Sequence, residues 1–94
     1  MSEFHNIYTH GYIRAAVCVP RVRISDPAAN LGYTLELARQ AHDRHAGIAV
    51  FPEMGLTGYS NDDLFQQDAL LNAAVEAVRG VVEASADLLP VLLV

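Results

Sequence analysis

The chain has 94 residues, of which 52% are hydrophobic and 18% charged, and its formal net charge at pH 7 is −5. This length allows one small domain at most. The acidic balance, with six arginines and no lysine, argues against binding to nucleic acid or to an anionic membrane surface.

The single cysteine, Cys18, excludes a disulfide within the chain and fits a reducing compartment. The residues that open the sequence, 1–6, carry no basic segment followed by an apolar one, as a secretory signal would. The uninterrupted apolar stretches are far shorter than the roughly 20 residues that a membrane helix needs. We therefore expect a cytoplasmic protein.

The first half of the chain predicts a strand followed by a helix. Residues 12–19 are rich in β-forming side chains and predict the first strand. Asp26 can cap a helix that has Pro27 at its first position, and the helix is expected to run to about His45 and to stop at Gly47. The residues that keep a helical spacing are Leu31, Leu35, Ala38 and His42, with Thr34, Leu37 and Ala41 beside them.

The second half predicts a further strand, helix and strand. Residues 48–51 form a short apolar run typical of a buried strand, a second helix is expected to end at about Ala86, and residues 88–94 predict the third strand. Gly80 should weaken the helix by about 1 kcal/mol relative to alanine. The apolar stripe of this helix is Leu71, Val75, Val78 and Val82, widened by Leu70, Ala74, Ala77 and Val81.

Strands and helices alternate in the order βαβαβ, which predicts an α/β fold with a parallel sheet. A parallel strand as apolar as residues 91–94 needs cover on both faces and neighbours at its edges. Two helices in one layer cannot cover both faces of the sheet. We therefore expect residues 1–94 to be the N-terminal part of a larger fold.

Glu53 is the first candidate for chemistry, because it follows a short apolar strand and Pro52. In open parallel sheets, ligands bind outside the carboxyl ends of the strands, where a glutamate can act as a general base. The alternatives are a cap for the following turn or a solvated carboxylate. The connection from Glu53 to Asn61 is longer than the usual two to six residues, which favours a functional loop. Gly55 and Gly58 are expected to supply positive φ angles or close backbone approach there.

Other candidates have simpler structural interpretations. Cys18 lies on a predicted core strand, where an inert buried thiol is expected. His42 and His45 could in principle bind a metal ion, but a solvated helix end is favoured because no further ligand is evident. Asp62 and Asp63 are expected to cap a helical turn. No glycine-rich phosphate loop follows a strand, so no cofactor is expected within these residues.

The segment from Val50 to Ser60, Val-Phe-Pro-Glu-Met-Gly-Leu-Thr-Gly-Tyr-Ser, followed by Asp62-Asp63-Leu64, resembles the first signature of the nitrilase, or carbon–nitrogen hydrolase, superfamily. More narrowly, it resembles the N-terminal glutaminase domain of the actinobacterial glutamine-dependent NAD⁺ synthetases. Residues 8–16, 26–30 and 83–90 share this narrower resemblance, which therefore covers nearly the whole chain.

The resemblance implies an αββα sandwich, of which residues 1–94 would be the N-terminal βαβαβ portion of a glutaminase (amidase) domain. It implies a Glu–Lys–Cys triad in which Glu53 is the general base. Tyr59 would lie near the substrate pocket or the ammonia route, or else pack under its own loop. The family's lysine and nucleophilic cysteine lie well downstream of the glutamate. The chain has no lysine and its cysteine lies upstream, so the 94 residues alone are expected to be inactive.

The same resemblance implies glutamine as the substrate and a C-terminal synthetase domain as the partner. That domain would use ATP, Mg²⁺ and nicotinic acid adenine dinucleotide to form NAD⁺ from the released ammonia, and the intact enzyme would be a homo-oligomer. Two alternatives stay open at this point. One is a stand-alone amidase, nitrilase or carbamoylase, and the other is a non-catalytic α/β fragment whose apolar surfaces serve assembly.

Overall fold

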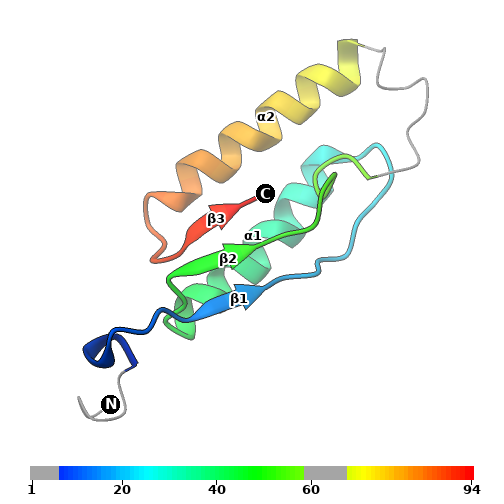
Figure 1. Ribbon diagram of the computed structural model, residues 1–94. Helices are drawn as coiled ribbons and strands as arrows, with labels where there is room; N and C mark the ends of the chain where they lie inside the picture. The colour runs from blue at the N-terminus through cyan, green and yellow to red at the C-terminus, as the bar shows by residue number, and fades with distance from the viewer. Residues whose placement is uncertain (1–6, 59–67) are drawn as a thin grey trace.

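The computed structural model describes residues 7–58 and 68–94. In chain order these form the 3-10 helix η2 (Ile7–His10), strand β1 (Ala15–Val17), helix α1 (Pro27–Asp43), strand β2 (Ile48–Val50), helix α2 (Asp68–Ser85) and strand β3 (Val91–Leu93) (Figure 1). The strands make one sheet in the order β1-β2-β3, and both pairs are parallel. The predicted α/β fold with a parallel βαβαβ order is confirmed, although each strand is shorter than predicted.

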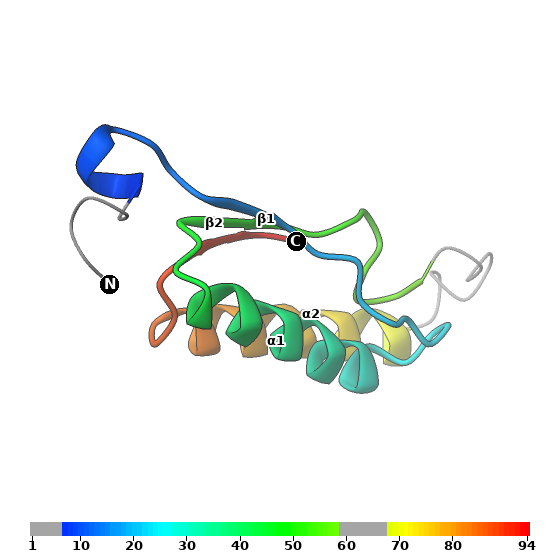
Figure 2. The same ribbon diagram turned by 90° about the horizontal axis from the view of Figure 1, so that it is seen from below.

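Both helices lie on the same face of the sheet, so the molecule has two layers (Figure 2). The inward side chains of the strands, Ala16, Ala49 and Leu92, occupy equivalent positions in the parallel register and pack toward this helix layer. Neither α1 nor α2, the two long helices of the described chain, is apolar enough over its length to cross a membrane.

Helix α1 begins where the sequence predicts. The Asp26 side chain accepts a hydrogen bond from the backbone N–H of Ala29 at 3.2 Å, and Pro27 occupies the first turn. The helix ends at Asp43, and the positive φ that follows it belongs to His45, at 60°. The prediction that Gly47 ends the helix is therefore wrong, because the turn that reverses the chain lies two residues earlier.

The buried face of α1 contains Thr34, Ala38 and Ala41 of the predicted residues, together with Asn30, which was not predicted. Ala38 and Ala49 are both fully buried, which shows that the helix lies close against the sheet. Such close approach favours small side chains, so the leucines predicted for this face lie at its margins, where they are half-buried. The residues of α1 buried beyond its first turn are Asn30, Thr34, Ala38 and Ala41.

Only part of the predicted apolar stripe of α2 is buried. The side chains that α2 buries are Leu70, Ala77 and Val81, which are among the residues predicted to widen the stripe. The stripe itself is exposed, with 45%, 58%, 46% and 63% of the residue surface accessible at Leu71, Val75, Val78 and Val82. The two rows are adjacent on the helix. Gly80, which directly precedes Val81, faces Leu31 of α1.

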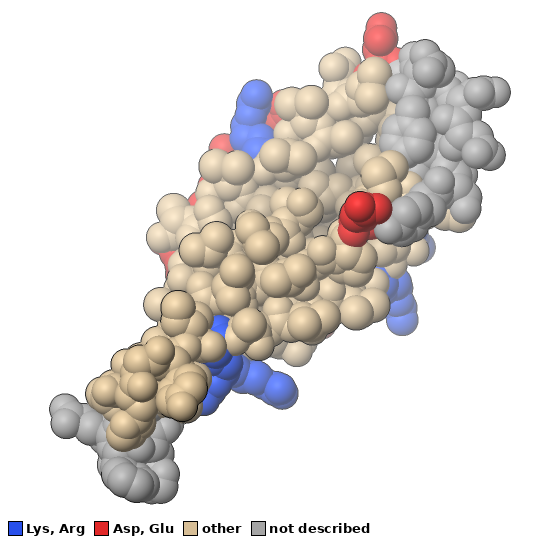
Figure 3. Space-filling model, in the orientation of Figure 1, with Lys and Arg blue, Asp and Glu red and all other residues tan. Residues whose placement is uncertain are grey.

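The face of the sheet opposite the helices is apolar and uncovered among the described residues. Val17, Val50 and Leu93 lie side by side in the parallel register on this face. Val17 is 83% exposed and Leu93 is 49% exposed. Figure 3 shows mostly uncharged side chains over the strands, with charged ones toward the rim. This agrees with the expectation that two helices leave one face of the sheet without cover.

Candidate functional site

Glu53 lies at the carboxyl end of β2, the middle strand. Phe51 is 8% exposed and belongs to the core, and its backbone N–H donates to the carbonyl oxygen of Leu93 at 2.9 Å. Pro52 has no N–H to extend this ladder, so the strand ends and Glu53 opens a turn. Glu53 is exposed, and no partner for its carboxylate is found within residues 7–58 and 68–94. The core thus fixes Phe51, while the carboxylate two residues later is accessible.

The turn that Glu53 opens has a defined backbone shape. Met54 has a φ of 56°, and its carbonyl oxygen accepts from the N–H of Gly58 at 2.7 Å. Gly58 has a φ of 82°, and a Cβ atom there would lie 3.3 Å from the Cα of Ile24. The prediction for Gly58 is therefore confirmed. For Gly55 it is wrong, since the positive φ falls on Met54 and a Cβ at Gly55 would meet only the Pro52 oxygen, at 3.4 Å.

A second loop, between β1 and α1, fastens this turn. The N–H of Ser25 donates to the carbonyl oxygen of Thr57 at 2.9 Å. The side-chain amide of Asn30 donates to the carbonyl oxygens of Leu56 and Arg23, both at 2.8 Å, and accepts from the N–H of Arg23 at 2.6 Å. The sequence analysis gave Asn30 no role. The feature that could have indicated one is its helical spacing from Thr34 and Ala38, which places a polar amide on the buried face of α1.

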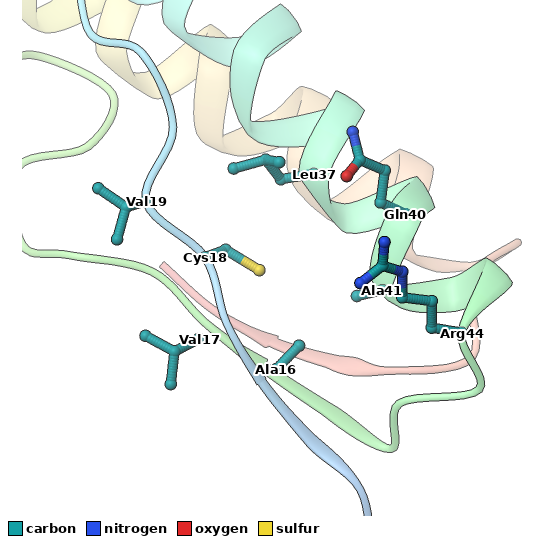
Figure 4. A pocket seen from close by; sticks show the side chains of 8 residues that line it. All are labelled: Ala16, Val17, Cys18, Val19, Leu37, Gln40, Ala41 and Arg44. Carbon is teal, nitrogen blue, oxygen red and sulfur yellow. The ribbon is translucent and has the colours of Figure 1, made fainter.

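The Cys18 thiol faces the helix layer. Its side chain points from the end of β1 toward Leu37 and Ala41 of α1, in a small pocket that Gln40 and Arg44 close on the solvent side (Figure 4). Cys18 is 7% exposed, and burial raises the pKa of its thiol. The thiolate is the nucleophilic form, so a raised pKa disfavours reaction at Cys18. The prediction of a buried cysteine in the core is confirmed.

The two histidines near the end of α1 take part in hydrogen bonds, His42 through its side chain and His45 through its backbone. His42 accepts a hydrogen bond at Nδ1 from the backbone N–H of Leu89, at 2.8 Å. His42 is therefore not the merely solvated residue that the sequence analysis favoured, because it ties α1 to the segment before β3. The carbonyl oxygen of His45 accepts from the Tyr8 hydroxyl at 2.5 Å. In the described ranges, no three histidine, cysteine or acidic side chains gather as a metal site would require.

Of the predicted site residues, the structure therefore places Glu53 alone. Tyr59 and the predicted caps Asp62 and Asp63 lie outside the described residues. What the described part offers is a carboxylate at the edge of a parallel sheet, open to a ligand and carried on a loop that the neighbouring loop fastens. Such a group can accept or donate a proton, while a nucleophile would have to come from elsewhere.

Comparison with known proteins identifies the family. The carbon-nitrogen hydrolase family model matches residues 14–93. The chain is 50% identical over 92 residues to the glutamine-dependent NAD(+) synthetases of Mycobacterium bovis and Mycobacterium tuberculosis, and 48% identical to that of Mycobacterium leprae. In each case the match covers 98% of this chain but only 14% of the relative's length. The chain therefore belongs to the carbon–nitrogen hydrolase family.

Proposed function

We propose that residues 1–94 are the N-terminal part of the glutaminase domain of a glutamine-dependent NAD⁺ synthetase. The observation that carries this proposal is the position of Glu53 at the carboxyl end of the middle strand, within a segment that the family model matches. The relatives named glutamine-dependent NAD(+) synthetase align with 98% of the chain at about 50% identity, which favours this substrate over those of other amidases.

Glu53 is the general base in this proposal. Its carboxylate accepts the proton of a cysteine thiol from another part of the protein, and the thiolate attacks the carboxamide carbon of glutamine. A lysine, also from outside these residues, stabilises the oxyanion. The C–N bond of the tetrahedral intermediate then breaks while Glu53 gives the proton to the departing nitrogen. Ammonia is released, and a glutamyl thioester remains on the cysteine. Water attacks the thioester with Glu53 again accepting a proton, which gives glutamate and restores the thiol.

The open face of the sheet supports a larger fold around this site. Val17, Val50 and Leu93 present an apolar surface on the side away from the helices. Parallel sheets of this composition are covered on both faces. We propose that a second sheet covers it in the αββα arrangement, and that the intact enzyme is a homo-oligomer.

The remaining partners belong outside these residues. Tyr59 is proposed to line the glutamine pocket or the route of the ammonia. ATP, Mg²⁺ and nicotinic acid adenine dinucleotide are assigned to a C-terminal synthetase domain. The residues that the structure describes do not fit these groups, since they bring together neither a metal-ligand cluster nor a glycine-rich phosphate loop.

The test is Glu53→Gln in the full-length protein, with ammonia release from glutamine as the readout. The amide keeps the size of the side chain but cannot accept the proton, so the rate should fall on the order of 10²–10⁴-fold. Glu83→Gln is the matched control, because Glu83 is an exposed carboxylate on α2, remote in sequence from this loop. Unchanged ammonia release by Glu53→Gln would show that Glu53 is not the base.

A further inference from the structure

Asn30 occupies an unusual place for an amide side chain. It lies in the first turns of α1, and its exposed fraction is 0%. An amide in such a place is unfavourable unless its polar atoms find partners. Here both N–H groups of Nδ2 donate, to the carbonyl oxygens of Arg23 and Leu56, and Oδ1 accepts from the N–H of Arg23. Asparagine supplies both donors and the acceptor at this length of side chain.

These bonds join two loops that leave the same edge of the sheet. Arg23 belongs to the loop that follows β1, and Leu56 belongs to the loop that follows β2, three residues after Glu53. Figures 1 and 2 show both loops running from the carboxyl ends of their strands to the N-terminal end of α1. The bond from Ser25 to Thr57 lies beside the Asn30 amide and ties the same two loops.

The joined loops hold backbone conformations that non-glycine residues rarely adopt. Ser25 has a φ of 57° and Met54 has a φ of 56°. Such conformations persist when the surrounding contacts determine them, and they are common where a side chain must be aimed. Met54 directly follows Glu53, so its φ sets the direction in which the chain leaves the candidate base. The Asn30 amide is the buried polar group that bonds to the far side of this turn.

We propose that Asn30 is a positioning residue for the Glu53 carboxylate. Through Leu56, its amide holds the turn that begins at Glu53 and keeps Met54 in its positive-φ conformation. This inference rests on the proposed function of Glu53. A general base must lie within hydrogen-bond distance of the proton it accepts, and a misplacement of about 1 Å can cost on the order of 10²-fold in rate.

The experiment compares Asn30→Ala with Val81→Ala in the full-length protein. Both remove a buried side chain, but Val81 lies in α2 and belongs to a separate part of the core. For glutamine hydrolysis we expect Asn30→Ala to lower kcat about 10–100-fold with little change in KM, and Val81→Ala to leave both nearly unchanged. Asn30→Ser keeps a hydroxyl with a single donor, so its kcat should lie between that of Asn30→Ala and that of the unaltered protein. It also serves as the working variant if Asn30→Ala does not fold.

A double-mutant cycle separates positioning from a merely structural role. If Asn30 acts through Glu53, adding Asn30→Ala to Glu53→Gln should lower the residual kcat by less than about twofold. Equal losses for Asn30→Ala and Val81→Ala, or losses that multiply fully with Glu53→Gln, would overturn the inference while leaving Glu53 as the base. Full activity of Glu53→Gln itself would overturn the proposed function, and the role of Asn30 with it.

Discussion

Gly80 of α2 faces the side chain of Leu31 in α1, and its replacement by alanine gives a sharp test of the packing between the two helices. A Cβ atom at Gly80 would lie 2.6 Å from Cδ2 and 3.2 Å from Cδ1 of Leu31. Alanine gains about 1 kcal/mol of helix stability over glycine. Overpacking of a core typically costs about 1–3 kcal/mol, and here the end of the half-buried Leu31 side chain must move aside. Gly80→Ala should therefore lower the free energy of unfolding by about 0–2 kcal/mol.

Gly32 is the matched control, since it lies within α1 and a Cβ atom there would meet nothing within 4 Å. Gly32→Ala should raise the free energy of unfolding by the full increment of about 1 kcal/mol. Urea denaturation of the two variants, followed by far-UV circular dichroism, gives the comparison. Leu31→Ala should relieve the overpacking, so the double variant with Gly80→Ala should show a coupling of about 0.5–3 kcal/mol. Equal stabilisation by Gly32→Ala and Gly80→Ala would refute the packing described for α1 and α2.

Two further predictions concern Cys18 and His42. Burial raises the pKa of the Cys18 thiol above its ordinary value of 9.0, so its contribution to stability is present below pH 9.0 and declines at higher pH, where the unfolded chain loses the proton first. Urea titrations between about pH 8 and about pH 10 should show this decline, and Cys18→Ala should reduce it; an identical pH slope in both proteins would contradict the buried thiol. His42→Ala removes the acceptor of the Leu89 N–H and should lower the free energy of unfolding by about 0.5–1.5 kcal/mol. Hydrogen exchange at the Leu89 amide should become faster, and unchanged exchange would show that this bond is absent in solution.

The order of the elements could be predicted because its signals are local. Asp26 and Pro27 mark the start of α1 through backbone chemistry within one turn, and the apolar run at residues 48–51 is too short for anything but a strand. The position of Glu53 after β2 follows from the same run. These features depend on neighbours in the sequence, so the sequence alone was sufficient.

The faces of the helices could not be predicted in the same way. In α2, the rows containing Val78 and Val81 are both apolar, and periodicity cannot tell which of them is buried. The choice depends on the close approach at Gly80, which is a contact between residues far apart in the sequence. The positive φ at Met54 is likewise set by the neighbouring loop, so no local pattern marked it. The spacing of Asn30 from Thr34 and Ala38 placed it on their face of α1, but its bond to Leu56 depends on the other loop.

Glu53 is proposed to serve the release of ammonia for NAD⁺ synthesis. The direct measurement is NAD⁺ formation by full-length Glu53→Gln protein, supplied with either glutamine or ammonium as the nitrogen source. We predict that glutamine-supported synthesis falls on the order of 10²–10⁴-fold while ammonium-supported synthesis persists, because only the first requires the general base. Equal rates of the Glu53→Gln protein from the two nitrogen sources would contradict the role of Glu53 as the base. No NAD⁺ formation by the unaltered protein from either source would contradict the assignment to an NAD⁺ synthetase.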